Sequence, residues 1–112
     1  MISSNLRLAQ MLYRIADLME IGGENPFKIN AFRKAGASIE RMDEAIEEVE
    51  PTDLPGIGPG IGQVIKEWLE KGTSSLLSEW ERKIPPDLLL LLQIPGFGPK
   101  SVGRLYRELK ID

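Results

Sequence analysis

The 112-residue sequence contains no cysteine and no histidine. Without cysteine the chain has no disulfide and no thiolate nucleophile, and without histidine it lacks most ligands of zinc sites. Long hydrophobic runs are also missing, because the longest, Leu88 to Leu92, is far too short to cross a bilayer. The first twenty residues carry charges throughout and do not resemble a signal peptide. We therefore expect a soluble intracellular domain without a membrane partner.

Excess positive charge is absent as well, since the net charge is −3. Nucleic-acid-binding domains are usually basic, so this value is a weak argument against that function. The acidic residues, however, are concentrated in the segment 43–50, which contains five carboxylates and no lysine or arginine. We expect that segment to face away from any polyanion that the rest of the chain binds.

Apolar residues recur at helical spacing along the chain, and no segment alternates as a strand would. The first helix is expected to use Ser3, Ser4 or Asn5 as its cap and to stop at Gly22-Gly23. A second helix is expected to begin at Asn25-Pro26. Its predicted apolar side consists of Phe27, Ile29, Ala31, Phe32, Ala35 and Ile39.

The remaining chain is predicted to be helical too. The acidic segment 43–50 is expected to form a short helix that packs through Ala45, Ile46 and Val49. Further helices are expected after residue 59, around residue 80, from residue 86, where the leucine run is interpreted as core, and after residue 99. The predicted fold class is therefore all-α, with two small helical lobes.

Two glycine-rich segments, 54–59 and 94–99, repeat each other forty residues apart. They read Leu-Pro-Gly-Ile-Gly-Pro and Ile-Pro-Gly-Phe-Gly-Pro, and each is expected to connect two helices. A supersecondary unit that occurs twice is stronger evidence than one copy. The pattern is the signature of a helix-hairpin-helix motif, although two ordinary tight turns of a helical bundle are the alternative.

The chemistry of this pattern favours an anion site. Its glycines can adopt positive φ, where other residues pay about 1–2 kcal/mol, and the apolar residue between them, Ile57 or Phe97, can plug the gap between the flanking helices. Its last proline suits the first position of the next helix. Main-chain N–H groups then remain exposed at a helix start, where anions bind. The second copy adds a row of cations, which we call the cationic rail: Lys100, Arg104 and Arg107.

Five segments in this order resemble the start of family X DNA polymerases, the bacterial members above all. They are NPFKINAFRKA (25–35), LPGIG (54–58), KGT (71–73), IPGFGPKS (94–101) and LYRELKI (105–111). The resemblance implies a lyase-like amino-terminal domain, 1–82, with the first hairpin, and the start of a DNA-binding subdomain, 83–112, with the second. It implies a monomer that binds gapped duplex DNA with a 5′-phosphate, in the cytoplasm of a bacterium at the nucleoid, and takes no small-molecule substrate in this part.

The resemblance also assigns site residues. Lys28 matches a lysine that contacts the 5′-phosphate, and the expected DNA-binding set is Lys28, Lys34, Gly56, Gly58, Gly60, Gly96, Gly98, Lys100, Ser101 and Arg104. Main-chain carbonyls match positions that bind a monovalent cation, Na⁺ or K⁺, in the family: those of Thr52, Leu54, Ile57, Leu92, Ile94 and Phe97. Mg²⁺ is expected only in the polymerase domain of a longer, nucleotidyltransferase parent.

Two positions depart from the family, and the first is Gly60, which stands where relatives have another phosphate-binding lysine. Val64 stands where lyase-active relatives have the lysine that forms a Schiff base, and valine has no amine. We therefore expect this part of the chain not to be catalytic by itself. Two alternatives remain: a lyase that uses a displaced lysine (Lys28, Lys34 or Lys66), and a protein-interaction module that docks through the segment 43–50.

Overall fold

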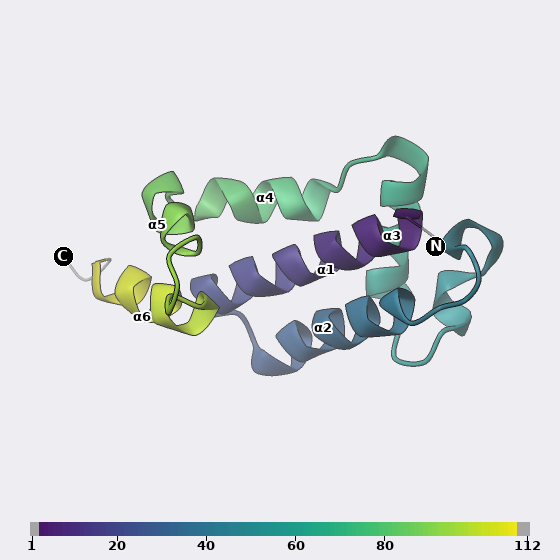
Figure 1. Cartoon of the computed structure of the whole chain (residues 1–112), viewed down its shortest axis with the longest axis horizontal. Helices are drawn as coiled ribbons and strands as arrows, with labels where there is room; N and C mark the ends of the chain where they lie inside the picture. Colours follow the sequence, from purple (N-terminus) through teal and green to yellow (C-terminus); the bar gives the residue numbers. More distant parts are fainter. Residues whose placement is uncertain (1–2, 110–112) are drawn as a thin grey trace.

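A computed structural model describes residues 3–109, and this range is helical without any strand (Figure 1). The α-helices are α1 (Ser3–Gly22), α2 (Pro26–Glu40), α3 (Pro59–Lys71), α4 (Ser75–Lys83), α5 (Pro86–Leu91) and α6 (Pro99–Leu109). Two short 3₁₀ turns, η1 (Ile46–Glu48) and η2 (Pro51–Asp53), lie between α2 and α3. The predicted all-α fold class is confirmed. No helix in this range is long and apolar enough to cross a membrane.

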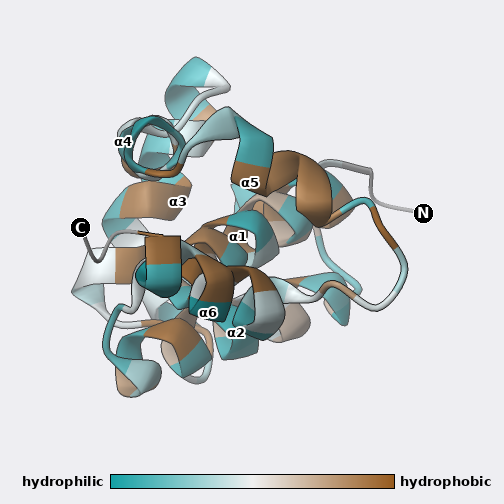
Figure 2. Cartoon of the chain, turned by 90° about the vertical axis from the view of Figure 1, so that its left-hand side faces the viewer, coloured by the Kyte–Doolittle hydropathy of each residue, from teal (hydrophilic) through white to brown (hydrophobic). Residues whose placement is uncertain are grey.

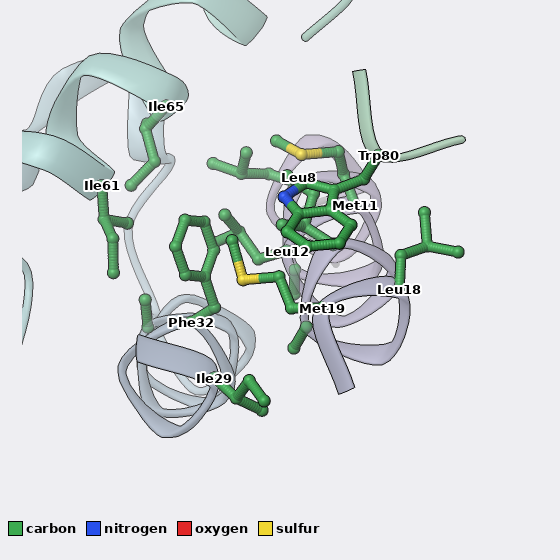
Figure 3. Close-up of a cluster of buried hydrophobic side chains, with 14 of the residues drawn as sticks. Leu8, Met11, Leu12, Leu18, Met19, Ile29, Phe32, Ile61, Ile65 and Trp80 are labelled. Carbon is green, nitrogen blue, oxygen red and sulfur yellow. The ribbon is translucent and has the colours of Figure 1, made fainter. Parts of the chain in front are cut away.

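Helix α1 forms the axis of the molecule. It packs against α2 along its length and contacts α4 and α6 toward its carboxyl end (Figure 1). Its apolar side chains Leu8, Leu12 and Ile15 are completely buried. Figure 3 shows that Phe32 of α2 and Ile65 of α3 point into the same cluster. The predicted apolar stripe of the first helix is thus the centre of the core.

The start of α2 agrees with the sequence prediction in its cap but not in its packing. The Oδ1 atom of Asn25 accepts a hydrogen bond from the backbone N–H of Phe27 at 2.8 Å, and Pro26 occupies the first helical position. The Phe27 side chain, predicted to be on the apolar face, is instead 85% exposed. Ile29, two residues later in the same turn, is 4% exposed, and Phe27 leaves α2 about 160° away from it, on the face that is turned to solvent.

The acidic segment is not the helix that its pattern predicts. Asn5, predicted to be a cap, lies inside α1, and its buried amide accepts from Ile46 N–H at 2.9 Å and donates to the Glu44 carbonyl at 2.7 Å. Because these backbone groups are engaged with Asn5, and neighbouring carboxylates repel each other, only the 3₁₀ turn η1 forms. Ser4, also within α1, donates to Glu47 at 3.1 Å, and the side chain of Ser3 is outside the described part.

Helix α6 docks on the carboxyl end of α1. Val102 is completely buried, and a Cβ atom added to Gly103 would lie 3.1 Å from the Glu20 carbonyl oxygen and 3.2 Å from Ile21 Cα. Of the leucine run predicted to be core, Leu88 is buried but Leu90 is 58% exposed. Because Ile84, Leu88 and Val102 join the same apolar cluster as α1, the helices on both sides of the glycine-rich segment 94–99 are anchored to that helix. The boundary between 1–82 and 83–112 stays a prediction.

Candidate nucleic-acid interface

The two glycine-rich segments form the same turn, and we call them hairpin 1 (54–59) and hairpin 2 (94–99). In each, the first glycine is left-handed, with φ of +80° at Gly56 and +91° at Gly96. The second glycine was also expected to use positive φ, but Gly58 is extended, with φ of −87°, and Gly98 has no positive φ either. Hairpin 2 follows α5 as predicted, whereas hairpin 1 follows only the 3₁₀ turn η2. One residue per turn therefore requires glycine for its backbone conformation.

Main-chain amides at the start of α3 and α6 are left without an internal partner. The first helical hydrogen bonds run from Gly62 N–H to the Gly58 carbonyl at 2.9 Å and from Val102 N–H to the Gly98 carbonyl at 3.0 Å. The preceding amides make no hydrogen bond to any residue in the range 3–109: those of Gly58, Gly60 and Ile61, and those of Gly98, Lys100 and Ser101. Three donors at a helix start are the arrangement that binds an oxyanion.

Space around these amides is open. A Cβ atom added to Gly58, Gly60 or Gly98 would have no heavy atom within 4 Å. These glycines are therefore not required by internal packing. Their lack of a side chain instead lets a ligand approach the backbone closely.

The central apolar residues of the two hairpins differ in burial. Ile57 is 4% exposed and packs as the predicted plug, whereas Phe97 remains 38% exposed, and Ile94 beside it is 46% exposed. In Figure 2 the turn of hairpin 2 extends from the body of the molecule between α5 and α6. The flanking helices α5 and α6 therefore leave the Phe97 side chain partly exposed.

A cavity of about 420 Å³ brings Lys28 together with hairpin 1. Its lining includes the three glycines predicted to bind phosphate, Gly56, Gly58 and Gly60, and also Val64. Apart from Lys28 its walls are apolar, with Phe32, Ile61 and Leu76 among them. The structure thus places the predicted phosphate lysine beside the predicted phosphate-binding backbone.

Lys28, in the first turn of α2, forms an ion pair with Glu24, which lies just before that helix. Its Nζ lies 3.6 Å from Oε2 of Glu24, and the other carboxylate oxygen accepts from Asn25 N–H at 2.9 Å. The Asn25 hydrogen bond is the main reason why the pKa of Glu24 is below its ordinary value. An anion that binds Lys28 therefore competes with an ionised carboxylate.

The cationic rail lies on the outer side of α6, opposite buried Val102. Lys100, Arg104 and Arg107 are all exposed, and within residues 3–109 none of them forms an ion pair. Ser101 is exposed in the first turn of the same helix. Hairpin 2 therefore combines main-chain donors with exposed positive charge, as predicted.

The carbonyl sets predicted to bind a monovalent cation have compatible chemistry. Leu54 and Ile94 each accept one hydrogen bond, from Ile57 N–H at 3.2 Å and Phe97 N–H at 3.0 Å. The other carbonyls of the two sets accept none from residues 3–109: Thr52, Ile57, Leu92 and Phe97. Hard cations bind oxygen ligands, and main-chain carbonyls are such ligands for K⁺ in channel filters, so the residues fit such an ion.

The other lysines considered for lyase chemistry lie elsewhere. Lys66 Nζ is 3.1 Å from Oε1 of Glu50, and its hydrogen bond is the largest cause of the lowered pKa of Glu50. Lys34 lines a different cavity, which sequence reasoning did not recognise. A larger cavity of about 660 Å³ between α1, α3 and α4 contains none of the predicted site residues.

Comparison with known proteins agrees with this geometry. A model of the helix-hairpin-helix domain matches residues 3–74, which include hairpin 1; hairpin 2 is recognised here by its repeat and its geometry. The DNA polymerase/3′-5′ exonuclease PolX of Bacillus subtilis (strain 168) is 42% identical over 105 residues, which is 93% of this chain and 18% of that protein. The chain thus spans less than a fifth of that relative, and the resemblance to bacterial family X polymerases is confirmed. Turn geometry and domain match together show that the chain belongs to the helix-hairpin-helix domain family.

Proposed function

We propose that the chain binds DNA without regard to base sequence, as the part of a gap-filling repair polymerase that holds the gapped duplex and its 5′-phosphate. The observation that carries this proposal is the pair of amide triplets at the starts of α3 and α6, which have no internal partner and lie at turns whose glycines Gly58, Gly60 and Gly98 are exposed. Such donors contact phosphates, which every DNA sequence presents alike. A cationic rail at one triplet and Lys28 at the other add attraction for the same groups.

The separation of the hairpins supports contact with two parts of one duplex. Hairpin 1 and hairpin 2 lie at opposite ends of the molecule, whose long dimension is 48 Å (Figure 1). Helix α1 between them has 20 residues and is therefore about 30 Å long. At about 3.4 Å per base pair this corresponds to roughly nine base pairs. A single domain can then hold duplex on both sides of a short gap.

The acidic segment does not block this function. None of the residues 43–50 lines the cavity of Lys28, and Glu50 is paired with Lys66. In this proposal a monomer acts on DNA in the bacterial cytoplasm, at the nucleoid. Na⁺ or K⁺ at the hairpin carbonyls would bridge backbone and phosphate, while Mg²⁺ belongs to a polymerase domain of the longer protein.

Binding to a gapped duplex tests the proposal directly. With about three to four phosphate contacts, log K is expected to fall against log salt with a slope near −3. Removing the 5′-phosphate is expected to weaken binding, since Lys28 and the hairpin 1 amides lose a ligand of higher charge. Fluorescence anisotropy at several salt concentrations measures both effects. A slope near zero, or no binding to the phosphorylated gap, would contradict the proposal.

We also propose that the Lys28 cavity binds its DNA end without lyase chemistry. Val64 supplies no amine there, and the Nζ of Lys28 lies 3.6 Å from the Glu24 carboxylate instead of being free to form a Schiff base. Borohydride treatment with an incised abasic-site duplex is expected to trap no covalent adduct. If an adduct forms and Lys28→Ala abolishes it while binding persists, the displaced-lysine lyase is the correct alternative.

A further inference from the structure

A second cavity flanks hairpin 1. It measures about 350 Å³ and is lined by Lys34, Ala37, Ser38, Arg41, Pro55 and Gly56. Gly56 is the one lining residue that it shares with the cavity of Lys28. Because Lys28 and Lys34 are six residues apart, their side chains leave α2 about 120° apart around its axis. The turn of hairpin 1 therefore has two separate cationic neighbours from one helix.

The cations of this second cavity are arranged along a line. Lys34 and Arg41 are seven residues apart, which places them on the same side of α2 and about 10 Å apart along it. Both are exposed, and neither has an ion pair within the described range. Between them, the Ser38 hydroxyl donates to the Pro55 carbonyl at 3.5 Å, and this long contact joins the helix to the turn.

That spacing fits a run of phosphates better than one terminal phosphate. Successive phosphates of one strand in a duplex advance by about 3.4 Å along the axis and lie farther apart than that along the winding strand, so two cations about 10 Å apart face different phosphates. A single phosphate group cannot meet both cations at that separation unless their side chains converge. The cavity of Lys28, in contrast, offers one cation and neighbouring hairpin amides, which suits an end group.

We propose that Lys34 and Arg41 form a second anion site, which binds consecutive internal phosphodiesters of a DNA strand beside the hairpin 1 site. The proposal rests on the DNA-binding function proposed above. It divides the DNA contacts of this end of the molecule into two: Lys28 and the hairpin amides take the terminal phosphate, and the second site takes continuous backbone.

The double variant Lys34→Ala/Arg41→Ala tests the division. It is expected to weaken binding to gapped duplex about tenfold at low salt, equally with and without the 5′-phosphate, and to reduce the salt slope by about 2. Lys28→Ala is instead expected to reduce the preference for the 5′-phosphate. Arg82→Ala/Lys71→Ala is a matched control, because it removes one exposed lysine and one exposed arginine away from both hairpin 1 cavities.

The outcomes separate the two proposals. If the unmodified chain does not bind gapped DNA, the proposed function fails. If it binds and the double variant behaves like the matched control, or loses affinity only for the phosphorylated duplex, the second site is refuted alone. Circular dichroism confirms that each variant is folded.

Neutral methylphosphonate linkages, which replace charged phosphodiesters, identify the DNA strand that the second site contacts. Three successive linkages are introduced either in the continuous template strand or in the strand that carries the 5′-phosphate. The second site contacts the strand whose modification removes the difference in binding affinity between the unmodified chain and the double variant. If the difference persists in full with both modified duplexes, at every position tested, internal phosphodiesters are not the ligand.

Discussion

Lys100→Glu is expected to weaken binding to gapped duplex about tenfold or more at low salt. Lys100 belongs to the amide triplet of hairpin 2 and begins the cationic rail, so its reversal removes a charged contact and adds a repulsive carboxylate beside the phosphate. Loss of a charged hydrogen bond costs about 1.5–3 kcal/mol, which corresponds to roughly tenfold to more than a hundredfold in affinity. Titration of labelled DNA at two salt concentrations measures the loss, which should shrink at high salt.

Lys71→Glu is the matched control for this change. Lys71 is also an exposed lysine, but it ends α3, far along the helix from the hairpin 1 amides. Its reversal alters the net charge by the same amount, so a general effect of charge appears equally in both variants. Equal losses would show that the cationic rail is ordinary solvated surface, whereas a loss confined to Lys100→Glu locates the phosphate at the hairpin.

Gly103→Leu is expected to lower the free energy of unfolding by about 3 kcal/mol. Gly103 lies where α6 crosses the carboxyl end of α1, and a Cβ atom there already meets backbone atoms of Glu20 and Ile21 at 3.1–3.3 Å. Backbone cannot rotate away as a side-chain tip can, so α6 must move from its buried seat on α1. For a chain of this size the melting temperature should fall by about 12 °C or more, as measured by thermal denaturation.

Gly98→Ala provides the comparison for that experiment. Gly98 also lies beside α6, yet a Cβ atom there would have no heavy atom within 4 Å. The free energy of unfolding of the Gly98→Ala variant should stay within about 1 kcal/mol of that of the unmodified chain. If Gly103→Leu unfolds at the same temperature as Gly98→Ala, the docking of α6 on α1 is not as described.

Features that depend on a few neighbouring residues could be predicted from the sequence. The hairpin turn is one, because its glycine and proline positions fix the backbone within six residues, and Gly56, Gly96 and Pro59 behave as expected. The Asn25 cap is another, since a cap bonds within its own first turn. The core stripe of α1 also followed from helical spacing, because a long amphipathic helix has one face to bury.

Features that depend on distant neighbours could not be predicted in the same way. The exposure of Phe27 depends on which face of α2 packs against the core, and the structure of the acidic segment depends on Asn5, about forty residues earlier. Neither Ser38 nor Arg41 was among the predicted DNA-binding residues. The seven-residue spacing from Lys34 to Arg41 was visible in the sequence, but only the tertiary structure shows that these two residues lie beside Pro55 and Gly56.

The placement of the main donors on peptide groups has a consequence for how such a domain can evolve. Every amino acid except proline brings an N–H, so side chains around the two turns can drift without removing the donors themselves. Substitution is restricted instead at Gly56 and Gly96, whose left-handed backbone penalises other residues, and at Gly58, Gly60 and Gly98, where a side chain would stand between ligand and backbone. Surface charge can therefore change, and a reactive lysine can be lost, during evolution while the backbone amides continue to bind phosphate.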